Sequence, residues 1–180
     1  MPDRRVTPPR AGPPIAVRPA HPADTLALLT VHARAIRKLA ASHYSEDQRD
    51  AWIARMSPER LQEAMSARQL LVAEVAAPEG PRVVGYGQLH PVEGAIEAIY
   101  VDPDYSRQGV GRALCTALED RARALGLPGL VLDASLNSVP FYAAMGFRQK
   151  CLDHHTLAPG VHIACAVMEK RFTPAAPVRE

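Results

Sequence analysis

The segment from Tyr100 to Leu114 constrains the fold of this chain more than any other part of its sequence. It reads Y-V-D-P-D-Y-S-R-Q-G-V-G-R-A-L, which places two glycines between a β-rich run and the first turn of a helical pattern. Glycines at such a junction let several backbone N–H groups converge, and the positive end of the helix dipole attracts an anion there. The segment therefore predicts a phosphate-binding loop.

Two common phosphate-binding loops do not match this segment. Leu114 stands where a dinucleotide-binding fingerprint requires its third glycine, and no Gly-Lys-Ser or Gly-Lys-Thr follows as in a P-loop. An ordinary loop and helix start is the remaining alternative, because two glycines alone are a weak signal.

Hydrophobic periodicity predicts that strands and helices of an α/β domain surround this loop. A capping box at Ser45 and Gln48 opens one of the helices. The long helix before it has an apolar face made of Leu29, Ala33, Ile36 and Ala40. The expected strands span residues 15–18, 69–75, 82–90, 94–101, 130–133, 147–153 and 161–170, and the expected helices span 22–42, 45–53, a short stretch from 57, 103–126 and 138–145.

Length and composition fit one globular domain and exclude several functions. The chain has 180 residues and a net charge of +2, which is too balanced for a nucleic-acid-binding surface. No apolar run reaches the roughly 18 to 20 residues that a bilayer requires, so no membrane partner is expected. Three widely spaced cysteines without a C-x-x-C motif argue against disulfides, and we expect a cytoplasmic protein.

The two ends of the chain differ in composition from its centre. Five prolines and three arginines fall within residues 1–14, which we interpret as a disordered Pro-rich arm, with a docking peptide as the alternative. Residues 15–172 are expected to form a single domain, and residues 173–180 a flexible tail.

Two motifs in the right order carry a resemblance to a known family. The segment from Val101 to Leu114 and the later N-S-V-P-F-Y-A-A-M-G-F of Asn137 to Phe147 resemble the GNAT acyl-CoA N-acetyltransferases. The resemblance extends over about Ile15 to Arg171. It implies the GNAT fold, in which a mixed, mostly antiparallel sheet with splayed central strands is flanked by helices.

The resemblance implies acetyl-CoA as co-substrate. The family's phosphate-binding motif falls on Ser106, Gly109 and Gly111, although Ser106 replaces the usual Arg or Gln, and Arg107 is expected to compensate. Pantetheine is expected to pair with the free edge of the strand around Ile99 and Val101. The full expected coenzyme A site comprises Ile99, Tyr100, Val101, Ser106, Arg107, Gln108, Gly109, Val110, Gly111, Arg112, Asn137 and Tyr142. Asn137 is also predicted to cap the following helix.

Two residues are candidates for proton transfer. In similar GNAT proteins the tyrosine matching Tyr142 points at the sulfur of coenzyme A, where a phenol can protonate the leaving thiolate; a core aromatic packed on Phe147 is the alternative. Glu97 lies on an otherwise apolar strand, and strict alternation places it on the face of Ile99 and Val101, which suits a general base. A structural glutamate, a water chain or His90 are its rivals.

The acceptor site is expected between the first helices and the last hairpin. Its candidate residues are His43, Tyr44, Trp52, His90 and His154, with Tyr44 and Trp52 forming an aromatic floor. The set Cys151, Asp153, His154 and His155 suggests a metal, but neighbouring residues on a strand face opposite ways, so no metal is expected.

These observations favour acetyl transfer from acetyl-CoA to a primary amine by direct attack in a ternary complex. A small molecule is the expected acceptor, with a protein or peptide amine as the alternative. A second copy of the chain, in a homodimer, is a further candidate partner. A non-catalytic acyl-CoA sensor and an interaction protein that uses the Pro-rich arm are the competing functions.

Overall fold

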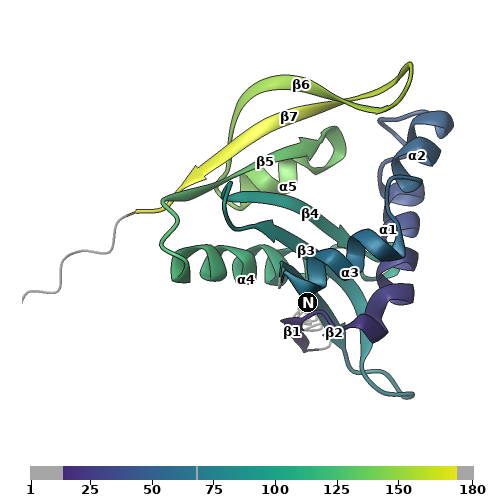
Figure 1. The fold of residues 1–180 in the computed structure, drawn as a ribbon, viewed down its shortest axis with the longest axis vertical. Coiled ribbons are helices and arrows are strands. Elements are labelled where there is room, and N and C mark those ends of the chain that lie inside the picture. The colour runs from purple at the N-terminus through teal and green to yellow at the C-terminus, as the bar shows by residue number, and fades with distance from the viewer. Residues whose placement is uncertain (1–13, 68, 174–180) are drawn as a thin grey trace, which may run out of the picture.

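The computed structural model of the protein describes residues 14–67 and 69–173. Almost all of the expected arm and tail lie outside these residues. Within the described residues, seven strands form one sheet, and five α-helices and three 3₁₀ turns surround it (Figure 1). The strands are β1 (Ile15–Pro19), β2 (Leu70–Val75), β3 (Arg82–His90), β4 (Ala95–Val101), β5 (Gly129–Ser135), β6 (Arg148–Ala158) and β7 (Val161–Arg171). The helices are α1 (Thr25–Leu39), α2 (Glu46–Ile53), α3 (Pro58–Ser66), α4 (Val110–Ala124) and α5 (Val139–Ala144), and the 3₁₀ turns are η1 (Pro22–Asp24), η2 (Pro103–Tyr105) and η3 (Leu136–Ser138).

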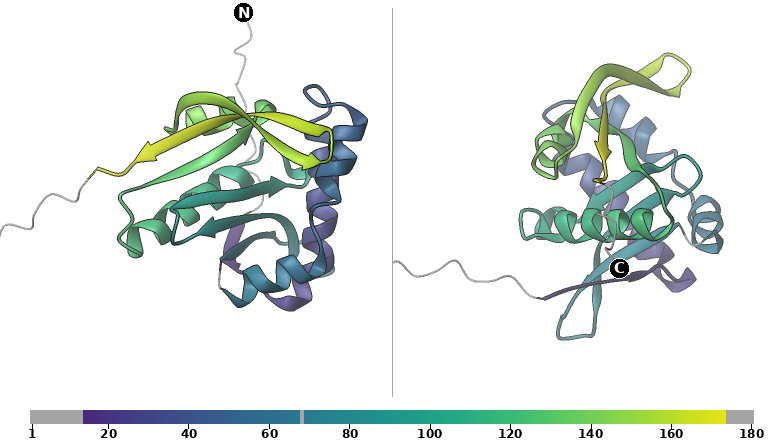
Figure 2. Two further views of the ribbon diagram at one scale, coloured as in Figure 1. Left: turned by 45° about the horizontal axis from the view of Figure 1, so that its top comes forward. Right: turned by 90° about the vertical axis from the view of Figure 1, so that its left-hand side faces the viewer.

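The sheet confirms the expected mixed, mostly antiparallel architecture. Its strand order is β1-β2-β3-β4-β5-β7-β6, and only β4 and β5 run parallel. The β6–β7 hairpin is a twisted ribbon whose tip lies beside α2 (Figure 2). Both of its strands are longer than the sequence predicted, and the register shifts twice along the hairpin.

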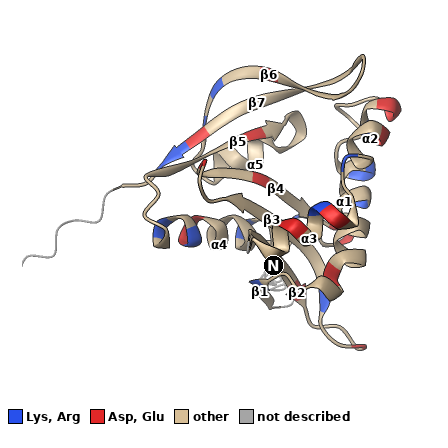
Figure 3. Cartoon of the chain, in the orientation of Figure 1, with Lys and Arg blue, Asp and Glu red and all other residues tan. Residues whose placement is uncertain are grey.

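Alternate residues of a strand point to opposite sides of the sheet, so both faces carry apolar residues, and helices cover both. On one face, Leu114 and Leu118 of α4 pack on residues such as Val84. On the other face, Leu28 of α1 and Leu61 of α3 pack around Tyr86. Acidic and basic residues are interspersed along these helices (Figure 3). Within the described residues, no helix is both long and apolar enough to cross a bilayer.

The capping box gave the correct start of α2, and the apolar face predicted for the first helix was correct in part. Ser45 and Gln48 form the predicted capping box at α2. The first helix begins with the η1 turn, and its α-helical part ends at Leu39. Of the predicted face, Ile36 and Ala40 are buried, whereas Leu29 and Ala33 are only half-buried. The other buried residues of α1 are Leu28, Val31, His32 and Ala35, so its core-facing side is rotated slightly from the predicted one.

An ion pair with a buried carboxylate joins β7, α4 and the turn after α5. Lys170 Nζ of β7 donates to both carboxylate oxygens of Glu119 in α4, at 2.6 and 2.7 Å, and to the carbonyl of Met145 after α5, at 2.7 Å. Glu119 is buried, so removing Lys170 leaves its charge with only the longer ion pair to Arg123, at 3.7 Å.

Lys170→Met is therefore expected to destabilise the fold by about 3 kcal/mol, or roughly 6–12 °C in Tm for a chain of this length. Thermal unfolding measures the change. Lys150→Met is the matched control, because Lys150 pairs with Glu169 at the surface, where a salt bridge contributes about 1 kcal/mol or less. Equal losses in the two variants would contradict the assigned role of Lys170.

Candidate active site

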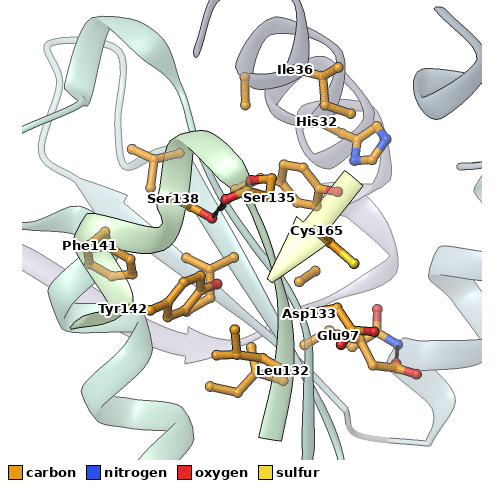
Figure 4. A pocket seen from close by; sticks show the side chains of 18 of the residues that line it. His32, Ile36, Glu97, Leu132, Asp133, Ser135, Ser138, Phe141, Tyr142 and Cys165 are labelled. Carbon is orange, nitrogen blue, oxygen red and sulfur yellow. Dashed lines mark hydrogen bonds between the residues drawn. The ribbon is translucent and has the colours of Figure 1, made fainter. Parts of the chain in front are cut away.

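The central strands separate and open a large cleft. Strands β4 and β5 pair only at Ala95 with Val131 and at Ile96 with Leu132, after which they diverge. The cleft between them has a volume of about 1870 Å³ and is lined by both strands, by α1 and by α5 (Figure 4). This volume exceeds that of an ordinary single-ligand pocket, about 300–1,000 Å³, so the cleft has room for two ligands side by side.

The diverging part of β4 offers unpaired backbone groups. The N–H of Asp102 donates to Val84 of β3 at 2.8 Å, which fixes the direction in which alternate residues of β4 point. Because N–H and C=O groups alternate sides along an antiparallel strand, those of Ile99 and Val101 point away from β3, toward the gap. Both residues line the cleft, as does Tyr100 between them.

The glycine-rich loop lies at one end of this cleft. Gly109 has φ of 91° and is the N-cap of α4, a left-handed conformation that favours glycine. The first-turn amides of Val110, Gly111 and Arg112 have no intrahelical carbonyl to bind, so they are available to an anion. A Cβ on Gly111 would lie 3.4 Å from the ring of Phe141, which shows how closely the backbone packs there.

The side chains around the loop divide into two groups. Ser106 donates to the carbonyl of Pro103 at 2.8 Å, and Gln108 donates to that of Asp104 at 2.9 Å, so both stabilise the turn itself. Arg107 and Arg112 are exposed and line the cleft beside the first turn of α4. Arg107 adopts a left-handed φ of 62°, as the turn requires.

Asn137 does not cap α5, so that prediction was wrong. The chain first forms the η3 turn, and Ser138 takes the N-cap position, where its hydroxyl donates to the carbonyl of Ser135 at 2.8 Å rather than capping the helix. The Oδ1 atom of Asn137 is instead buried without a hydrogen-bond partner among the described residues, and Asn137 lines the cleft. This amide oxygen is therefore available to a donor on a bound ligand.

Tyr142 is a buried residue in the wall of the cleft (Figure 4). Its ring meets Phe141 at 5.0 Å and Phe147 at 5.6 Å, both edge to face, so the core packing expected as its alternative is also present. Burial raises the pKa of the Tyr142 phenol, with smaller contributions from Cys115 and Tyr100. The phenol therefore keeps its proton at neutral pH and holds it more tightly than a solvent-exposed tyrosine does.

Glu97 lies in the cleft, but not on the face that strict alternation predicted. Gln88 pairs with Ala98 and Leu89 pairs with Ile96, so Glu97 is the extra residue of a β-bulge. Ile99 and Val101 pack toward α4, whereas Glu97 accepts a hydrogen bond from Gln88, on the face of Tyr86. The side chain is exposed rather than enclosed by apolar neighbours.

The predicted acceptor residues are only partly brought together. Trp52 and His90 line the cleft, whereas His43, Tyr44 and His154 do not. His43 and His154 are exposed. The Tyr44 hydroxyl donates to the carbonyl of Ala164 at 2.7 Å and accepts from the N–H of Leu136 at 2.8 Å, so Tyr44 ties the segment between α1 and α2 to β7 and η3 rather than forming a floor.

His32 is a cleft residue that the sequence did not single out. It is buried in α1, its Nδ1 lies 3.0 Å from the Tyr86 hydroxyl, and its ring meets Tyr100 at 4.5 Å. Burial lowers the pKa of His32 to about 4, opposed weakly by the backbone of Trp52. The imidazole is therefore neutral at pH 7, inside a cluster of aromatic side chains.

A second group of cleft residues, of which the sequence singled out only His155, lies on the wall formed by β5, β6 and β7. His155 Nε2 lies 3.1 Å from Asp133 Oδ2, and one ligand atom each of Asp133, His155 and Cys165 fall within 4.8 Å of one another. Burial first, then Asp133 and Asp153, raise the pKa of the Cys165 thiol to about 11. Sequence spacing could not show this group, because its members come from three strands.

Comparison with known proteins agrees with this geometry. A family model described as "Acetyltransferase (GNAT) domain" matches residues 40–165. The chain belongs to the GNAT acetyltransferase family. It is 32% identical over 134 residues to the uncharacterized N-acetyltransferase YafP of Escherichia coli, covering 74% of this chain and 81% of that protein.

Solved structures of GNAT proteins share the fold. A GCN5-related N-acetyltransferase from Rhodopseudomonas palustris is 32% identical, with a TM-score of 0.78 over 87% of this chain and 95% of its own. YncA of Salmonella typhimurium, a putative acetyltransferase solved with its cofactor acetyl-CoA, is 21% identical, with a TM-score of 0.66 over 90% of this chain and 96% of its own. This GNAT chain is thus an acyltransferase.

The buried His32 predicts that stability falls as the pH drops from about 6.5 toward 4. An unfolded histidine has a pKa near 6.5, whereas that of His32 is about 4. As the pH falls, the unfolded state is therefore protonated first, and this protonation stabilises it relative to the folded state. The contribution is complete above pH 6.5 and amounts to about 3 kcal/mol at most.

Urea unfolding at several pH values measures this loss. His32→Gln should flatten the slope between pH 6.5 and 4, whereas the exposed control His154→Gln should keep it. An unchanged slope in His32→Gln would show that other groups cause the acid sensitivity.

Proposed function

We propose that this GNAT enzyme transfers the acetyl group of acetyl-CoA to the primary amine of a small molecule, by direct attack in a ternary complex. One observation carries the proposal. The cleft joins the amides at the start of α4, the free edge of β4 and an aromatic pocket around His32 and Trp52 in one continuous space. A phosphate-rich donor and a compact acceptor can therefore meet between β4 and β5.

The donor half of the cleft suits coenzyme A. The amides of Val110, Gly111 and Arg112 would hold the pyrophosphate at the positive end of α4. The backbone of Ile99 and Val101 would pair with the pantetheine amides, as an added strand does. Acetyl-CoA supplies the acetyl group as a thioester.

Two side chains have the chemistry for proton transfer. The new C–N bond forms as the C–S bond breaks, so the amine loses a proton and the departing sulfur gains one. Tyr142, which remains protonated, would donate to the sulfur. Glu97 and its partner Gln88 face the acceptor half, where the carboxylate would accept the proton of the amine.

The tethering of α2 to the last hairpin favours a small acceptor. Arg55 donates to the carbonyl of Thr156 at 2.7 Å, and Gln48 donates to that of His162 at 2.6 Å. Together with the hydrogen bonds of Tyr44, these contacts join the two walls at the acceptor end. An extended peptide would need these walls apart, whereas a compact amine would not.

Gly111→Val is expected to weaken coenzyme A binding by about 100-fold or more, because charge-assisted hydrogen bonds to the pyrophosphate contribute about 1.5–3 kcal/mol each. The added methyl groups would push against Phe141, which lies 3.4 Å from an ideal Cβ. Calorimetry measures the affinity. Thr116→Val, on the exposed side of α4, is the control, and unchanged affinity in folded Gly111→Val would rule out this phosphate site.

Tyr142→Phe is expected to lower kcat by about 10² to 10⁴-fold while acetyl-CoA affinity stays the same, because only the proton donor is removed. Tyr105→Phe is the control, since Tyr105 is a partly buried tyrosine outside the cleft lining. Full turnover in Tyr142→Phe would show that Tyr142 is structural.

Glu97→Gln should lower kcat by a similar factor for an alkyl amine, which must lose a proton, and by less for an aromatic amine, which is neutral at pH 7. The two acceptors are compared in one steady-state assay. Equal turnover of wild type and Glu97→Gln with the alkyl amine would remove Glu97 as the base.

An acetyl-CoA turnover screen tests the acceptor class. Small alkyl and aromatic amines should be acetylated faster than peptides. Preferred peptide acetylation would overturn the small-molecule assignment, and coenzyme A binding without turnover of any acceptor would favour a sensor.

A further inference from the structure

We propose that Asp133, His155 and Cys165 form a binding site for one divalent transition-metal ion, best suited to Zn²⁺, in the wall of the cleft. The inference does not depend on the acceptor or on the catalytic roles of Tyr142 and Glu97. It revises the expectation of no metal, which considered only residues close in sequence.

Strand pairing explains why the three side chains meet. Asp133 of β5 pairs with Val167 of β7, and His155 of β6 pairs with Ile163 of β7. The two residues therefore stand on either side of β7, flanking Cys165 on the same cleft-facing side. All three come from strands, which hold ligands more rigidly than loops do.

The distances are close to those around a bound zinc ion. His155 Nε2 and Asp133 Oδ2 are 3.1 Å apart, and the atoms of the whole group lie within 4.8 Å of one another. Ligand atoms of tetrahedral zinc, bound at about 2.0–2.3 Å, are roughly 3.3–3.8 Å apart. Small side-chain rotations would therefore bring Cys165 Sγ to a common centre with the other two atoms.

The chemistry of the donor set selects the metal class. One thiolate, one imidazole and one carboxylate suit borderline-soft ions such as Zn²⁺ better than Mg²⁺ or Ca²⁺, which prefer oxygen. The carboxylates of Asp133 and Asp153 both act electrostatically on Cys165, so a cation there would be stabilised by negative charge from two strands.

The fourth coordination position would face the cleft. All three residues line the cleft, and Figure 4 shows Asp133 beside Glu97, with Cys165 close by on β7. Three protein ligands with one open position is the arrangement of zinc sites that take an outside ligand. Water or an electron-pair donor of a bound acceptor would complete the coordination.

Cobalt titration of the metal-free full chain tests the site. We expect one Co²⁺ per chain, with the near-ultraviolet thiolate-to-cobalt charge-transfer band, visible bands of four-coordinate Co²⁺, and displacement by Zn²⁺. Cys165→Ser should remove the charge-transfer band. His155→Ala and Asp133→Asn should weaken Co²⁺ binding by about tenfold or more, since even outer contacts of metal ligands contribute about that much.

Matched neighbours separate this site from adventitious binding. Cys151→Ser and His154→Ala change exposed residues of β6, the strand of His155, and should leave both the charge-transfer band and the Co²⁺ affinity unchanged. His155 is about half exposed, with 47% of its side chain accessible, so its variant is expected to fold even if Cys165→Ser does not. Absence of the band at one equivalent, its survival in Cys165→Ser or its loss in Cys151→Ser would overturn the proposal.

Discussion

The short parallel contact between β4 and β5 is the feature on which the rest of the site depends. Only two residue pairs join these strands, whereas β4 is also held by β3 and β5 is paired with β7 along its whole length. The sheet therefore consists of two well-paired halves that meet at Ala95 and Ile96. Past that point the edge of β4 is free, and the start of α4 lies where a ligand paired with this edge would place its phosphates.

Much of this arrangement could be predicted because its causes are local. Two glycines between a strand and a helix specify a tight turn whatever surrounds them, and the apolar period of α4 fixes its buried side. The capping box at Ser45 similarly depends on residues three positions apart. The family resemblance then supplied the splay of the sheet, which no local pattern could indicate.

The incorrect expectations have non-local causes. The face of Glu97 is set by a bulge that depends on the register with β3, and alternation within β4 cannot show it. Tyr44 was expected to line the acceptor site because aromatic side chains are common in binding pockets. Its hydroxyl instead forms hydrogen bonds with backbone groups that are distant in the sequence. Asp133, His155 and Cys165 meet only once β5, β6 and β7 are in register.

Amide hydrogen exchange followed by NMR, with and without coenzyme A, tests the central claim that the free edge of β4 is the donor site. Tyr100, whose backbone faces β3, should be protected in both states. Ile99 and Val101 should gain protection only when coenzyme A is bound, together with the first-turn amides of α4. Coenzyme A binding that leaves the exchange of Ile99 and Val101 unchanged would contradict this account.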